Sequence, residues 1–145
     1  MPHGDFSDKV GYFSLITGLA SIVSPGLWYQ EFGPIKPMFE GSLTPESSAL
    51  ISFTGTLLLF IGVVSYGVRW NTINSITATL GYSIAAVNSL YIAYQMDGSS
   101  FVLRGWHVIA LMYVLGALHM KFNPNPVWTS KTLKAHEDEK AKKKK

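Results

Sequence analysis

The stretch from Ser47 to Val68, "SSALISFTGTLLLFIGVVSYGV", has the length and composition of a membrane-spanning helix. It contains no charged side chain, and a helix needs about 20 apolar residues to cross the hydrocarbon core of a bilayer. Ser, Thr and Gly interrupt its aliphatic residues, which suits a helix that packs against other helices. The stretch therefore predicts one transmembrane helix of a larger helical assembly.

Three other segments have the same character: Val10 to Tyr29, Thr72 to Tyr94, and Phe101 to Met120. Only 14% of the 145 residues are charged, against about 25% in soluble domains, and those charges gather at the two ends and in short joints. The sequence predicts an all-α fold, an integral membrane antiparallel four-helix bundle over residues 1–121. A basic, solvent-exposed tail is predicted at residues 122–145.

Pro25 and Gly26 shorten the helix that the first of these segments can form. A re-entrant or interfacial helix is the alternative for this segment. The preceding "MPHGDFSD" contains two Asp residues and no Lys before Lys9, and no small-x-small cleavage site follows. We therefore expect a helix of the mature chain and not a cleaved signal peptide.

The joints between the segments predict helix ends and turns. Before the second segment, Thr44 is suited to cap a helix, Pro45 to its first position and Glu46 to its first turn. The joint "RWNT" is very short, and Asp97-Gly98 predicts a turn in the next joint. The second, third and fourth helices are therefore expected to be consecutive antiparallel neighbours.

The basic residues predict an orientation, since loops rich in Lys and Arg stay on the cytosolic side. Four spans place Lys9, Arg69, Lys121 and the Lys residues of the tail on one side, and Lys36 and Arg104 on the other. This is ten basic residues against two. Both termini are expected in the cytosol, or in the matrix or stroma if the membrane belongs to an organelle.

Each predicted helix carries a stripe of small residues at helical spacing, and such stripes let membrane helices approach closely. The predicted packing residues are Gly18, Gly55, Gly62, Gly81, Gly116 and, as a polar contact, Asn88. Because an amide is costly in hydrocarbon, Asn88 is expected to point inward and to form an interhelical hydrogen bond.

The fourth helix also contains Arg104, His107 and His119. The two histidines lie on nearly opposite faces and about 18 Å apart along the helix, so they cannot ligate one metal or haem together. We expect them to be polar helix ends, with Arg104 and His107 reaching water at the headgroups. The alternative is that one of them ligates a single pigment or haem in a larger assembly.

Residues for catalysis are missing from the sequence. It has no Cys, no zinc-protease, nucleophile-elbow, phosphate-loop or dinucleotide motif, and no carboxylate within a predicted span. We therefore predict a protein that is not an enzyme and has no catalytic residue, metal site or cofactor. Nucleic acid is not an expected partner.

The tail "KTLKAHEDEKAKKKK" is expected to be a solvated charge run. Lys142, Lys143, Lys144 and Lys145 are the predicted membrane-surface residues, because a basic segment beside a membrane attracts anionic lipid. Lys142 and Lys143 also match the dilysine signal for retrieval to the endoplasmic reticulum. This favours an endomembrane such as the endoplasmic reticulum.

In plan, the chain resembles small four-helix membrane proteins of the DoxX-like kind from Val10 to Met120. The resemblance consists of a first span that ends at a Pro ("SIVSPGLWYQEFG"), an acidic loop, a second span rich in small residues ("ESSALISFTGTLLLFIG") and two tight hairpins. It implies a membrane bundle and carries over no catalytic residue.

Two function classes remain open. The first is a non-enzymatic scaffold, lipid-contacting or regulatory protein of an endomembrane, whose partners are the bilayer and other membrane subunits or copies of itself. The second is an accessory subunit of a bioenergetic complex, such as a photosystem or respiratory complex, in an organelle inner membrane or thylakoid. The tail and the absence of an Arg-rich transit sequence favour the first class.

Overall fold

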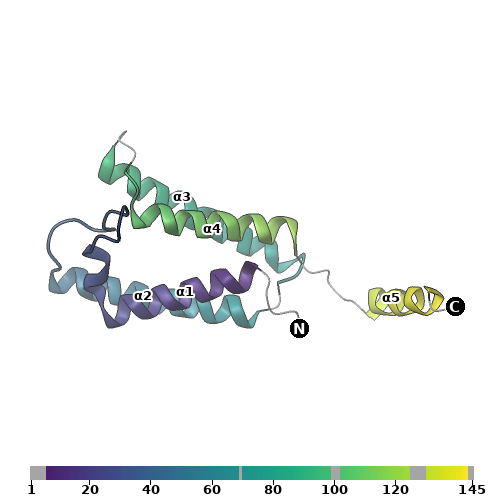
Figure 1. Ribbon diagram of the computed structural model, residues 1–145. Helices are drawn as coiled ribbons and strands as arrows, with labels where there is room; N and C mark the ends of the chain where they lie inside the picture. Colours follow the sequence, from purple (N-terminus) through teal and green to yellow (C-terminus); the bar gives the residue numbers. More distant parts are fainter. Residues whose placement is uncertain (1–5, 69, 99–101, 125–129, 144–145) are drawn as a thin grey trace.

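The protein is described by a computed structural model that covers residues 6–68, 70–98, 102–124 and 130–143 (Figure 1). These residues form helices joined by loops with isolated bridges, so the predicted all-α class is confirmed. The elements are α1 (Phe6–Val23), the 3-10 helix η1 (Pro25–Tyr29), α2 (Pro45–Gly67), α3 (Asn74–Asp97), α4 (Gly105–Phe122) and α5 (Ser130–Lys143). Of the described helices, α2 and α3 are long and apolar enough to cross a membrane.

The four long helices are arranged as two pairs. Helix α1 packs along α2, and α3 packs along α4, while a smaller contact between α1 and α4 joins the pairs (Figure 1). Helices α2 and α3 follow each other in the chain but lack an extensive contact. The expectation that they are close neighbours was wrong, because the small residues of α2 are used against α1.

Glycine allows the backbones of α1 and α2 to touch. A Cβ atom added to Gly18 would lie 2.7 Å from the carbonyl oxygen of Gly55, and one added to Gly55 would lie 2.7 Å from the carbonyl oxygen of Gly18. A Cβ atom on Gly62 would meet the side chain of Leu15 at 2.7 Å. No Cβ atom fits at these distances, so this pair is held at a spacing that only glycine permits.

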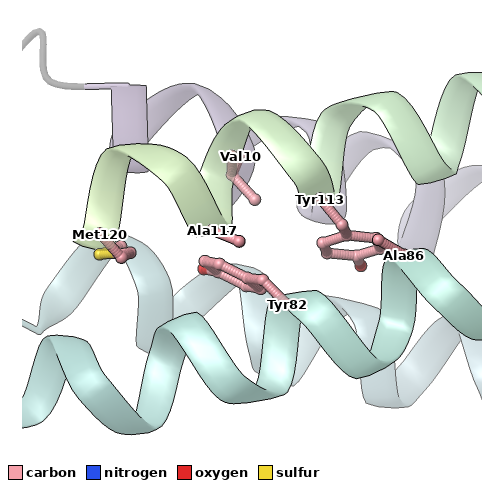
Figure 2. Packing of buried hydrophobic residues seen from close by; sticks show 6 residues of the cluster. All are labelled: Val10, Tyr82, Ala86, Tyr113, Ala117 and Met120. Atoms are coloured by element: carbon pink, nitrogen blue, oxygen red, sulfur yellow. The ribbon is translucent and has the colours of Figure 1, made fainter. Parts of the chain in front are cut away.

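The second pair uses aromatic side chains where the first uses glycine. Tyr82 of α3 and Tyr113 of α4 lie between their helices with ring centroids 5.6 Å apart (Figure 2). They belong to a buried cluster with Val10, Ala86, Ala117 and Met120. Val10 brings α1 into this cluster, which is therefore the main apolar link between the two pairs.

Gly116 lies where three helices meet. A Cβ atom added there would be 3.1 Å from Cγ2 of Val10 and 3.2 Å from Cδ2 of Tyr82. The absence of a side chain on α4 at this level leaves room for α1 and α3 at the same time. Gly116 thus shapes the link between the pairs.

The helix ends follow local chemistry. Thr44 caps α2 as predicted, since its hydroxyl oxygen accepts from the N–H of Ser47 at 3.2 Å and the Ser47 hydroxyl accepts from the N–H of Thr44 at 3.0 Å. Helix α1 ends at Val23 because Pro25 disfavours a helical conformation at Ser24, whose φ is −143°. The segment predicted to run to Tyr29 continues there as η1.

Gly81 and Asn88 lie elsewhere than expected. Both are on the exposed face of α3, and a Cβ atom added to Gly81 would meet nothing within 4 Å. The buried stripe of α3 consists of Ser75, Tyr82, Ala86, Ser89 and Ala93. The sequence analysis predicted that the small residues of α3 face the other helices. Helix α4 instead contacts the neighbouring stripe, which carries the large ring of Tyr82.

The basic tail contains a helix. Residues Ser130–Lys143 form α5, which stands apart from the other helices (Figure 1). Its Lys, Glu and Ala residues have high helix propensity, and Glu139 pairs with Lys143 one turn later at 2.8 Å. Lys142 and Lys143 are exposed on α5, whereas Lys144 and Lys145, like Arg69, lie outside the described residues.

Gly55→Ala tests the contact between α1 and α2. The new methyl group would lie 2.7 Å from the carbonyl oxygen of Gly18, so the helices must move apart, which we expect to cost about 1–3 kcal/mol. Gly67→Ala is the matched control, because a Cβ atom there meets nothing within 4 Å. The thermal unfolding midpoint of the purified chain should fall for Gly55→Ala only; equal midpoints would contradict the contact.

Candidate functional site

The most polar buried group of the described residues is the guanidinium of Arg104, at the start of α4. Arg104 is only 5% exposed. Its Nε and Nη2 atoms each donate to the carboxylate of Asp97 at 2.6 Å, and Nη1 donates to the carbonyl oxygen of Pro37 at 3.1 Å. Nη2 also donates to the carboxylate of Glu40. The expectation that Arg104 reaches water was wrong, because acceptors from two segments surround it.

The turn between α3 and α4 brings these partners together. Asp97 ends α3, and Gly98 follows with a φ of +61°, a conformation that glycine adopts without strain. Arg104 has extended backbone at the cap position of α4. Its N–H donates to Nδ1 of His107, one turn into the helix, at 3.2 Å. The side chain is therefore aimed back at the end of α3.

The loop between η1 and α2 docks on the same turn through its backbone. The N–H of Lys36 donates to the carbonyl oxygen of Leu103 at 2.8 Å. The indole N–H of Trp106 donates to the carbonyl oxygen of Met38 at 2.8 Å. Met38 also lies against Gly105, where an added Cβ atom would be 2.5 Å from its Cγ. This loop is thus fixed to α4 on both sides of Arg104.

Charge pairing keeps Arg104 cationic. The hydrogen bonds that Arg104 donates to Asp97 raise the pKa of Arg104 further above its usual value, and the one that it donates to Glu40 acts in the same direction. Burial opposes this shift and is outweighed. The side chain of Asp97 is only 9% exposed, whereas that of Glu40 is 66% exposed. Asp97 is therefore the main partner of Arg104, and Glu40 is a secondary one at the surface.

An apolar cavity of about 170 Å³ lies beneath the docked loop, between α1 and α4. Its walls include Phe13 and Thr17 of α1, Trp28 of η1, and Val108 and Ile109 of α4. Almost all of the surface that faces it is apolar. The chemistry of these walls suits a hydrocarbon group.

The two histidines of α4 lie at opposite ends of the helix. His107 is next to Arg104, and its Nδ1 atom already accepts the hydrogen bond from the backbone of that residue. His119 is half-buried, with its ring centroid 6.2 Å from that of Phe6. The structure does not bring them together, and no group of three or more potential metal ligands occurs among residues 6–68, 70–98, 102–124 and 130–143.

A second polar group was missed by the sequence analysis. The hydroxyl groups of Ser65 and Tyr82 form a buried hydrogen bond of 2.9 Å between α2 and α3. Ser14 of α1 is fully buried, and its hydroxyl has no hydrogen-bond partner in the described part of the chain. Tyr82 shares helical spacing with Ser75, Ala86 and Ser89, a signal that the search for small residues alone overlooked.

Comparison with known protein families, curated proteins and solved structures gives no match. The resemblance to DoxX-like proteins therefore stays a prediction. The functional reasoning below depends on the geometry of this chain.

Arg104→Gln tests whether the guanidinium holds the loop and the turn together. The variant loses its charged hydrogen bonds to Asp97 and Glu40, which we expect to cost on the order of 2 kcal/mol. Glu31→Gln removes only the exposed pair with Lys36 and serves as the control. Limited proteolysis should cut the loop at residues 30–44 faster in Arg104→Gln only. Unchanged cleavage would contradict this role of Arg104.

Proposed function

We propose that this chain is an integral membrane protein of four antiparallel spans that acts without catalysis, as a scaffold, lipid-contacting or regulatory protein of an endomembrane. The observation that carries this proposal is the exposed surface of α1 to α4. Large apolar side chains stand outward on all four helices, and a monomer in water rarely exposes so continuous an apolar surface.

The exposure involves the largest apolar side chains. Ile16 of α1 is 68% exposed, Phe60 of α2 is 67% exposed, and Ile76 of α3 is 71% exposed. On α4, Leu111 and Leu118 are also exposed. Lipid tails are a favourable environment for these groups, whereas water is not. The few buried apolar residues agree with this, since helices in lipid do not need a large core.

The shorter helices are compatible with spanning. Helices α1 and α4 have 18 residues each, which is near the lower limit for a span. Their charged residues lie at the ends, with Asp8 and Lys9 in the first turn of α1 and Lys121 in the last turn of α4. The aromatic η1 helix prolongs α1 at the other end and suits the headgroup level.

The polar features fit the two surfaces of a membrane. Lys9 in the first turn of α1 and Lys121 in the last turn of α4 lie at one end of the bundle, which suits the cytosolic side. The exposed Lys142 and Lys143 of α5 suit contact with anionic lipid, at about 1 kcal/mol per basic residue close to the surface. The opposite end holds the Arg104 site, and the apolar cavity beside it suits part of a lipid acyl chain.

Cysteine labelling tests the topology. The natural sequence has no Cys, so single substitutions report on one position each. Ser42→Cys and Glu137→Cys, both at exposed positions, should react with an impermeant maleimide from opposite sides of sealed vesicles. Detergent should make both reactive and is the control. Labelling of both positions from the same side of the vesicles would contradict four spans. Release of the chain from the membrane by carbonate would contradict them as well.

An accessory role in a bioenergetic complex is the second candidate. It is favoured by α5, a charged helix that stands apart from the bundle and offers a separate contact to a larger subunit (Figure 1). Solubilisation of native membranes in mild detergent separates the two proposals. Co-migration with a coloured or redox-active complex supports the accessory role, and migration as a small colourless species supports the first proposal.

A further inference from the structure

The exposed face of α3 has a repeat of seven residues. Gly81, Asn88 and Gln95 are spaced by seven, and Thr77, Ile84 and Tyr91 lie between them with the same spacing. All six residues are exposed. Alternating steps of three and four residues place them in one seam along the helix, the pattern by which two helices pack side by side. We call these six residues the α3 seam.

Asn88 is the polar centre of the α3 seam. It is the fifteenth of the 24 residues of α3 and thus lies near the middle of the span under the proposed function. Its side-chain amide forms no hydrogen bond with any described residue, whereas the amide of Gln95 donates to the hydroxyl of Tyr91 at 2.8 Å. Lipid tails cannot satisfy a donor or an acceptor, so Asn88 requires a polar partner at its own depth.

The chain itself does not provide this partner. Helix α4 covers the opposite side of α3, where Tyr82, Ala86 and Ser89 are buried. Helix α2 touches α3 chiefly near Ser65 and Tyr82, and the two helices lack an extensive contact beyond it. The α3 seam is therefore open along the part that contains Asn88.

A second copy of the chain meets the requirement by symmetry. Two copies in one membrane share one orientation, so a two-fold axis along the membrane normal places Asn88 opposite Asn88 at the same depth. An amide offers both donors and an acceptor, and two of them can pair with each other. Gly81, two turns away, lines the cavity between α2 and α3, so the contact between the two copies is expected around Ile84, Asn88 and Tyr91.

We propose that the α3 seam is the interface of a parallel, two-fold symmetric dimer in which the side chains of Asn88 from two copies form hydrogen bonds across the axis. This proposal rests on the proposed membrane location of α3. It makes Asn88 a residue of self-association, with Ile84 and Tyr91 as its apolar neighbours. A different membrane protein that covers the same seam is the competing outcome.

Crosslinking through single cysteines tests the seam. Ile84→Cys, four residues before Asn88, should form a disulfide-linked dimer when native-like membranes are treated with a mild oxidant. Leu90→Cys is the control, because Leu90 is also exposed on α3 but points to the other side of the helix. The non-reducing gel should show a dimer for Ile84→Cys and little for Leu90→Cys. Equal crosslinking of both, or of neither, would overturn the proposal.

Asn88→Leu tests the amide itself. In the Ile84→Cys chain it should weaken dimerisation about tenfold, measured as crosslinked fraction against the ratio of protein to lipid. Unchanged dimerisation, or an Ile84→Cys adduct with a different protein, would overturn pairing of Asn88 with its copy. Carbonate extraction of the same membranes separates the two failures: a chain that stays in the membrane without dimerising refutes only the seam, and an extracted chain refutes the membrane location.

Discussion

The pairing of Arg104 with Asp97 is the interaction on which the loop end of the fold depends. The guanidinium joins the end of α3, the start of α4 and the loop that connects α1 to α2. The two helix pairs are otherwise linked by the cluster around Val10 and by the hydrogen bond between Ser65 and Tyr82. A buried charge is costly unless its partners are complete, so this site favours one arrangement of the pairs at that end.

The two pairs are built on different packing principles. Between α1 and α2, glycine removes side chains and the backbones touch, whereas between α3 and α4 the rings of Tyr82 and Tyr113 fill the space (Figure 2). Van der Waals contact holds helices together in either case, and it needs close fit more than apolar mass where the surroundings are lipid. Such packing is consistent with a protein whose outer surface carries its large apolar residues.

Local signals in the sequence predicted the helices well. The apolar segments, the break at Pro25 and the cap at Thr44 each follow from a few neighbouring residues, and the structure has all of them. The site around Arg104 could not be predicted this way, because Glu40 and Arg104 are 64 residues apart and meet only when the loop docks. The face of α3 was misjudged for a similar reason: which of two adjacent stripes is buried depends on the helix that packs against it.

The weak contact between α2 and α3 has a mechanical consequence. A cavity of about 260 Å³ lies between them, lined by residues such as Phe60, Val64, Ala78 and Ala85. Contact is extensive within each helix pair, whereas few side chains of α2 and α3 would resist sliding or opening of one pair against the other. Under the proposed membrane location, a change in bilayer thickness would therefore act first on the contact between α2 and α3.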